Sequence, residues 1–216
     1  MFWPSLPFRD LWSPAPPLVE QPTRLSDMLT AEEFLTVSLP LDAGRSELVR
    51  GELRVSPADG GAHGGAAANL GFVLAAFVRQ HGLGVVFAGG VGYQLLQLPR
   101  TVRVPDASFV RADQLPSDGM GPGFLRLTPD LAIEVLAPSD TESEIEEKLE
   151  DYLISGTRLI WVVDPMRRTV MIVTPDAPVR WLREGDTLDG ASVIPGFSCA
   201  VAEIFEGIAR TATASA

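Results

Sequence analysis

Two acidic side chains interrupt apolar stretches that otherwise have the pattern of buried β-strands. Glu134 lies in the stretch 131–136, and Asp106 follows Pro105 within the stretch 102–110. An ionised carboxylate inside a sheet loses several kcal/mol of hydration unless a cation or hydrogen-bond donors replace the water. Carboxylates at strand ends suit Mg²⁺ or Mn²⁺. The residues alone leave two interpretations of Glu134, a metal ligand or a paired structural acid, and Asp106 beside a proline could also be solvated.

Lys148 is the only lysine of the chain, since the other 16 of the 17 basic residues are arginine. A lysine ammonium is a compact charge on a flexible stem, which suits a reacting oxygen or a bound water better than a planar guanidinium does. Lys148 lies in the predicted helix that follows the Glu134 strand, so it could reach back over the carboxyl end of that strand. The alternative is an exposed lysine that pairs with Glu144 on the helix surface.

Two further polar residues are candidates for the same site. Glu52 follows the turn Arg50-Gly51 of a predicted hairpin and could be a third carboxylate near the metal, although a solvated strand residue fits the pattern as well. His63 lies in a Gly/Ala-rich stretch, residues 59–65, which we expect to be a loop before a long helix. An exposed or capping histidine is the simpler interpretation there, and contact with a phosphate is the alternative.

The periodicity predicts an α/β (α+β) fold with a mixed β-sheet flanked by helices. Thr30 and Glu33 form a capping-box pattern that predicts a short helix. Residues 66–80 have the pattern of a long apolar helix that ends at Gly82, and residues 141–155 have the pattern of a second long helix that ends at Gly156. The strand–helix–strand order around this last helix predicts a parallel crossover. The predicted strands are a hairpin over 47–55 and the segments 85–88, 92–97, 102–110, 131–136, 159–163, 170–173 and 179–182.

Length and composition predict one domain with extensions. The 216 residues, 46% of them hydrophobic, suit a Pro/Trp-rich N-terminal extension at 1–27, a single domain at 28–210 and a flexible tail at 211–216. The extension is apolar enough to favour a homodimer. The single cysteine, Cys199, is interpreted as a core thiol and excludes an internal disulfide. No apolar run reaches the roughly 20 residues of a membrane span, so we expect a cytoplasmic protein.

The net charge and the absence of several sequence motifs argue against some classes of function. A net charge of −11 speaks against a protein that coats nucleic acid by electrostatics, but it does not exclude a nuclease, because metal-binding carboxylates add to the negative total. The sequence has no phosphate-loop Gly-Lys-Ser/Thr, no CxxC pair, no zinc-type histidine pair and no nucleophile-elbow serine.

Several motifs in order along the chain resemble the bacterial Uma-two family of restriction-endonuclease-like proteins, within the PD-(D/E)XK nuclease superfamily. The resemblance covers about residues 30–205. The Asp106 and Glu134 motifs are the most specific ones. The motifs are Gly51-Glu52-Leu53, His63, Val104-Pro105-Asp106-Ala107-Ser108-Phe109-Val110, Pro129-Asp130-Leu131-Ala132-Ile133-Glu134-Val135-Leu136-Ala137-Pro138-Ser139-Asp140, Lys148-Leu149, Tyr152, Gly156, Trp161-Val162-Val163-Asp164-Pro165 and Ile194-Pro195-Gly196-Phe197.

The resemblance implies a restriction-endonuclease-like core and a Mg²⁺-dependent endonuclease that acts on DNA, with Mn²⁺ as a substitute ion. It maps the metal ligands onto Asp106, Glu134 and Glu52. The superfamily's usual lysine position holds Leu136 here, and the resemblance places the catalytic lysine at Lys148. The chain departs from the family pattern at Ala137 and around His63.

Two alternatives to the endonuclease remain at this point. One is a non-catalytic binding or assembly protein that keeps the nuclease fold, which the net charge of −11 and the apolar N-terminal arm favour. The other is a hydrolase of a small phosphate ester, for which the negative charge matters less.

Overall fold

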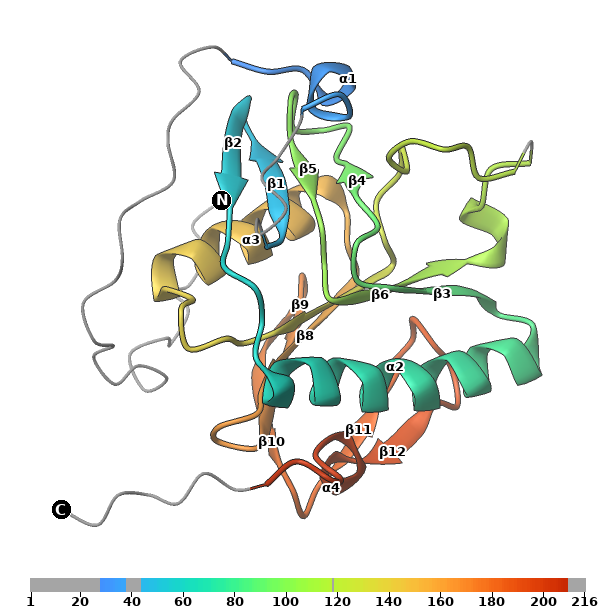
Figure 1. Ribbon diagram of the computed structural model, residues 1–216. Coiled ribbons are helices and arrows are strands. Elements are labelled where there is room, and N and C mark those ends of the chain that lie inside the picture. Colours follow the sequence, from blue (N-terminus) through green and yellow to red (C-terminus); the bar gives the residue numbers. More distant parts are fainter. Residues whose placement is uncertain (1–27, 38–43, 118, 210–216) are drawn as a thin grey trace, which may run out of the picture.

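The computed structural model describes residues 28–37, 44–117 and 119–209 (Figure 1). The N-terminal extension, on which the expected homodimer depends, and the expected tail at 211–216 lie outside these residues.

A six-stranded mixed sheet forms the centre of the fold. Its strand order is β10-β9-β8-β7-β6-β3. Only β7 and β8 pair in parallel, and the other neighbouring strands are antiparallel, so the predicted crossover and the predicted mixed sheet are confirmed. The strands are β3 (Gly84–Ala88), β6 (Ala107–Arg111), β7 (Leu131–Val135), β8 (Leu159–Asp164), β9 (Thr169–Thr174) and β10 (Ala177–Arg183).

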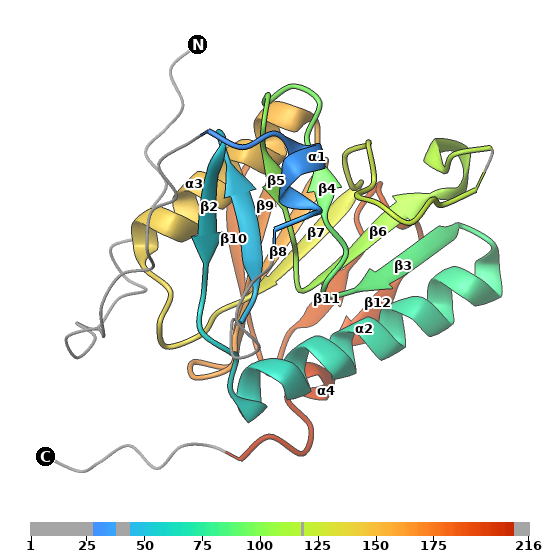
Figure 2. The same cartoon turned by 45° about the horizontal axis from the view of Figure 1, so that its top comes forward.

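Two long helices cover opposite faces of this sheet (Figures 1 and 2). Helix α2 (Gly61–His81) shares a core with Leu131 and Ile133 of β7, whereas α3 (Glu142–Ser155) shares a core with Ala132. Successive side chains of a strand point to opposite faces. Glu134 therefore lies on the face that α3 covers. Thr141 caps α3 in a capping box with Glu144, and Gly156 ends the helix in the left-handed conformation, as predicted.

Helix α2 begins earlier than the sequence pattern predicted. The expected loop at residues 59–65 is largely helical, because α2 starts at Gly61 after Gly60 as N-cap. Glycine costs helix stability, but packing of Ala66, Leu70 and the later apolar residues offsets that cost. His63 consequently lies in the first turn of a helix. By length and composition α2 could cross a membrane, although one face of it packs on the sheet core.

A smaller sheet of order β2-β1-β5-β4 lies beside the large one. Arg50 and Gly51, both with positive φ, form the predicted turn between β1 and β2. The predicted strand 92–97 is shortened to the two residues of β4. The strands are β1 (Ser46–Val49), β2 (Glu52–Val55), β4 (Tyr93–Gln94) and β5 (Val102–Arg103).

The predicted strand 102–110 is two strands in the structure. The chain leaves the small sheet after Arg103 and enters the large sheet at Ala107. Pro105 has no N–H to donate to a ladder, so the pairing is interrupted there. Asp106 lies at this junction, and its backbone N–H donates to Ile133 O over 2.9 Å.

The remaining elements complete the α2 side of the core. Sequence reasoning missed β11 (Thr187–Asp189), β12 (Ser198–Ala200) and the short helix α4 (Val201–Ile204). The short helix predicted from the capping box of Thr30 and Glu33 is present as α1 (Ala31–Phe34), which packs against Leu48 and Val102 of the small sheet. Cys199 is buried in that core, as expected, and burial raises the pKa of its thiol to about 11.

Candidate active site

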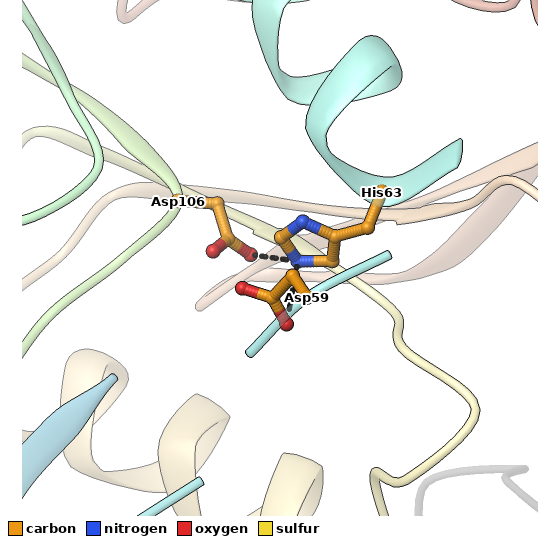
Figure 3. Close-up of side chains that lie close together, drawn as sticks. All are labelled: Asp59, His63 and Asp106. Atoms are coloured by element: carbon orange, nitrogen blue, oxygen red, sulfur yellow. Dashed lines mark ion pairs between the residues drawn. The ribbon is translucent and has the colours of Figure 1, made fainter. Parts of the chain in front are cut away.

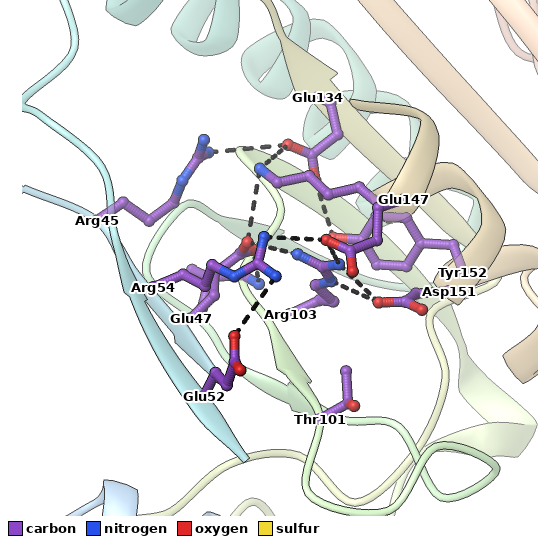
Figure 4. A network of polar contacts seen from close by, with 12 residues as sticks. Arg45, Glu47, Glu52, Arg54, Thr101, Arg103, Glu134, Glu147, Asp151 and Tyr152 are labelled. Atoms are coloured by element: carbon purple, nitrogen blue, oxygen red, sulfur yellow. Dashed lines mark hydrogen bonds and ion pairs between the residues drawn. The ribbon is translucent and has the colours of Figure 1, made fainter. Parts of the chain in front are cut away.

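The structure brings Asp106, Glu134 and Lys148 together where β7, α3 and the β5–β6 junction meet. Lys148 Nζ lies 3.1 Å from Glu134 Oε2, and the Tyr152 hydroxyl donates to Glu134 Oε1 over 2.8 Å. Lys148 is buried rather than exposed, and Glu144 is engaged in the helix cap, so the alternative of a surface pair is wrong. Both carboxylate oxygens of Glu134 therefore have a partner, one Lys148 and the other Tyr152 (Figure 4).

Arg45, which no sequence motif indicated, completes this group from the residue before β1. Its Nη1 donates to Asp106 Oδ1 and lies 3.8 Å from Glu134 Oε2. One cationic nitrogen therefore lies beside both strand carboxylates at once. The two carboxylates thus converge on one guanidinium.

Of the two acids in the β1–β2 hairpin, the structure places Glu47 near Lys148, whereas Glu52 lies apart from it. Glu47 is buried on β1, where its Oε1 accepts from Val104 N over 2.8 Å and its Oε2 lies 3.7 Å from Lys148 Nζ. Glu52 lies next to the hairpin turn on the edge strand β2, with 62% of its side chain exposed and Arg54 3.9 Å away (Figure 4). The structure does not bring Glu52 to the other site residues.

His63 is buried against Asp106, contrary to the expected exposed or capping histidine. Its Nε2 lies 3.3 Å from Asp106 Oδ2 and 3.7 Å from Asp59 Oδ1 (Figure 3). Asp106 Oδ2 also accepts from Val135 N over 2.7 Å. The two oxygens of Asp106 thus face different cationic groups, Oδ1 toward Arg45 and Oδ2 toward His63.

The two strand carboxylates differ in their electrostatics. Burial by itself raises the pKa of Asp106, but His63 and Arg45 outweigh it and hold that pKa below its usual value. Burial dominates at Glu134, whose pKa is raised even though Lys148 and Arg45 favour its ionised form. The fold therefore favours the charge on Asp106 and disfavours the charge on Glu134.

A second polar cluster holds the small sheet to α3 behind these residues (Figure 4). Arg103 Nε and Nη2 donate to Asp151 Oδ2 over 2.9 and 2.6 Å, and Arg103 Nη1 donates to Glu47 Oε2 over 3.0 Å. Arg50 donates to the other oxygen of Asp151 over 2.9 Å and to Glu147 over 2.7 Å. These bonds fix Glu47 and α3 relative to one another.

A cleft of about 500 Å³ reaches the Asp106 side of the site from solvent. Its polar lining includes Arg45, Asp59 and Asp106, and its apolar lining includes Phe34 and Phe124. Glu134 and Lys148 are buried and do not line this cleft. A substrate that enters the cleft would therefore meet Asp106 and Arg45 first.

Comparison with known proteins agrees with this fold. A family model described as "Putative restriction endonuclease" matches residues 31–202. A solved structure from Anabaena variabilis ATCC 29413, described as a putative nuclease belonging to DUF820, superposes with a TM-score of 0.71 at 20% identity over 82% of this chain and 97% of that chain. A search of curated proteins finds no match. The predicted nuclease-like α/β fold is confirmed, and the chain belongs to the Uma2 family of restriction-endonuclease-like proteins.

Proposed function

We propose that this chain is a Mg²⁺- or Mn²⁺-dependent nuclease of the PD-(D/E)XK type that hydrolyses phosphodiester bonds in DNA. The observation that carries the proposal is the convergence of Asp106 and Glu134 on one cation, the Nη1 of Arg45. Membership of a family of restriction-endonuclease-like proteins supports the nuclease class.

Asp106 and Glu134 would hold the metal ion, and Arg45 would leave the carboxylates as the ion arrives. A bound divalent ion supplies two effects in such a site, a lower pKa of a water ligand and stabilisation of charge on the phosphate. Because Arg45 lines the cleft, its released guanidinium stays on the side from which substrate enters and can bind a phosphate oxygen.

Lys148 would place its ammonium beside the reacting phosphate, where charge develops during hydrolysis. Burial lowers the pKa of this lysine, but Glu134 and Glu47 outweigh burial and raise it, so the ammonium stays protonated. Glu47 acts through Lys148 and is a positioning residue. Tyr152 fixes the orientation of Glu134 through its 2.8 Å hydrogen bond.

Cleavage of plasmid and branched DNA with Mg²⁺ or Mn²⁺ tests the proposal. We expect metal-dependent cleavage by the wild type and a loss of about 10²–10³-fold in Lys148→Ala, the range for removal of one donor to a transition-state anion. Glu52→Gln is the matched control and should cleave like the wild type. Unchanged cleavage in Lys148→Ala contradicts the role of the lysine, and no cleavage with either metal contradicts the function.

A non-catalytic binding protein is the second candidate, and Arg45 is the observation that favours it. The guanidinium already neutralises Asp106 and lies near Glu134, as a permanent structural cation would. This candidate predicts no heat of Mn²⁺ binding in calorimetry. Binding with a dissociation constant below millimolar that disappears in both Asp106→Asn and Glu134→Gln would exclude it.

A further inference from the structure

A second group of possible metal ligands lies on the other side of Asp106. It consists of Asp59, His63 and Asp106, whose ligand atoms all lie within 4.8 Å of one another (Figure 3). We propose that these three side chains form a separate cation position, which takes a divalent transition metal such as Mn²⁺, Co²⁺ or Zn²⁺. The imidazole ligand is the reason for this choice, because imidazole suits transition metals whereas Mg²⁺ prefers oxygen ligands.

The distances between the ligand atoms are close to those of an assembled site. Ligand atoms at about 2.1 Å from a common ion lie about 3.0 Å apart at right angles and about 3.4 Å apart at tetrahedral angles. His63 Nε2 lies 3.3 Å from Asp106 Oδ2 and 3.7 Å from Asp59 Oδ1. Two of the three pairwise distances are therefore within a few tenths of an ångström of these values, and the third, between Asp59 and Asp106, is at most 4.8 Å.

The orientation of His63 is an independent indication of a ligand. Only 6% of this residue is exposed, and Nε2 has no hydrogen-bond partner within the part of the chain that the structure describes. The nitrogen is directed at both carboxylates at ion-pair distances, but without a hydrogen bond of regular geometry to either. A buried polar atom of this kind requires an explanation, and a bound ion between the three groups provides one.

This position is distinct from the one between Asp106 and Glu134. Asp106 faces His63 with Oδ2 and Arg45 with Oδ1, so the carboxylate can bridge two cations. Asp59 lies on the cleft, which gives an ion access from solvent. The inference does not depend on the proposed nuclease activity, because an ion at His63 can be detected without nucleic acid and without Glu134.

The competing explanation is a protonated His63 that forms an ion pair with the two aspartates and excludes a metal. The chain contains only two histidines, which makes the distinction direct. His81, at the opposite end of α2, is exposed and lies against Phe77, so it is a matched control.

Pulsed electron paramagnetic resonance of Mn²⁺ on the full chain is the decisive experiment, with Glu134→Gln to remove the first cation position. We expect ¹⁴N coupling from an imidazole ligand in the wild type, Glu134→Gln and His81→Ala, and its loss in His63→Asn. Mn²⁺ that shows no ¹⁴N coupling in any of these proteins, or coupling that persists in His63→Asn, would overturn the proposal.

Calorimetry with Mn²⁺ alone gives a second readout that does not require a change in the core. Asp59 is partly exposed, so Asp59→Asn should fold, and we expect it to weaken Mn²⁺ binding at this position by at least about tenfold, the lower end for loss of a supporting ligand interaction. Unchanged affinity in both Asp59→Asn and His63→Asn overturns the site. Absence of DNA cleavage with ¹⁴N coupling retained would count against the nuclease function alone.

Discussion

Two polar clusters lie next to each other between the small sheet and the large one, and they are built differently. In the Arg103 cluster (Arg103, Glu47, Asp151, Arg50 and Glu147), the cations donate directly to carboxylates over 2.6–3.0 Å. In the Asp106 cluster (Asp106, Glu134, Arg45, His63 and Asp59), Arg45 donates directly to Asp106, but the other cation–carboxylate distances are 3.3–3.8 Å.

The hydrogen bonding shows the same difference. Arg45 Nε and His63 Nε2 are buried without hydrogen-bond partners among the described residues, whereas every guanidinium nitrogen of Arg103 lies within 3.0 Å of a carboxylate oxygen to which it donates. A fully paired buried network fixes one structure. In a buried network with fewer direct hydrogen bonds, a metal ion can replace one of the cationic side chains. We infer that the Arg103 cluster holds the fold together and that the Asp106 cluster is the site where ions bind.

Replacement of Arg103 by methionine should give the largest effect on stability. The change removes the guanidinium that donates to both Asp151 and Glu47, two buried carboxylates, and breaking a buried ion pair costs about 3–5 kcal/mol. Urea denaturation followed by circular dichroism measures it. Arg54→Met, with 43% of the side chain exposed, is the control and should change stability by less than about 0.5 kcal/mol. A loss below about 1 kcal/mol in Arg103→Met would show that this cluster is not structural.

Asp106→Asn should cost about 1–3 kcal/mol at neutral pH, because buried donors lose a charged acceptor. The pKa of Asp106 is lower in the folded state than its unfolded value near 3.9. Its ionised form therefore stabilises the fold above that pH, and this contribution is lost as the pH falls through the folded pKa. Denaturation between pH 7 and pH 3 should show the variant and the wild type converging on acidification; a constant difference would contradict this account.

Glu134→Gln should show the opposite pH dependence. The pKa of Glu134 is raised above its unfolded value near 4.3, so the group favours folding when it is protonated. That contribution is present below the unfolded pKa and is lost as the pH rises through the folded pKa. The stability of Glu134→Gln relative to the wild type should therefore increase with pH in the same titration. If the stability of Glu134→Gln relative to the wild type falls as the pH rises, Glu134 is a structural anion like the carboxylates of the Arg103 cluster.

Much of the fold and part of the site could be predicted from local sequence pattern. The helix and strand periodicities gave the elements, and acids within apolar strands indicated Asp106 and Glu134. Arg45, Glu47 and Asp59 could not be identified in this way, because their position at the site depends on how the small sheet packs against α3. His63 was expected in a loop because the glycines around it disfavour a helix, and tertiary packing overrode that preference.

Arg45→Met tests the Asp106 cluster, and its expected effect is smaller in free energy than those above. Removal of the guanidinium from between the two carboxylates should strengthen Mn²⁺ binding about tenfold, or about 1.4 kcal/mol, well within the roughly 4 kcal/mol interaction of two unit charges at 4 Å near a protein surface. Calorimetry measures the affinity. Weaker Mn²⁺ binding in Arg45→Met would mean that Arg45 supports the metal site and does not compete with the ion.

Glu52→Gln should give the smallest effect. This side chain is mostly exposed, and its nearest cation is the exposed Arg54 at 3.9 Å. Such surface pairs contribute about 0–1 kcal/mol, so we expect unfolding within about 0.5 kcal/mol of the wild type and an unchanged Mn²⁺ affinity. A tenfold loss of affinity would restore Glu52 as a metal ligand and would contradict the assignment of Glu47 to that part of the site.

A crystal structure with Mn²⁺, measured at a wavelength that gives anomalous signal from manganese, tests the central claim most directly. The account predicts an anomalous peak bound by Asp106 and Glu134, with the Arg45 guanidinium moved away from both carboxylates, and no such peak in Glu134→Gln. A wild-type crystal at saturating Mn²⁺ without a peak between these carboxylates, and with Arg45 still bonded to Asp106, would contradict it.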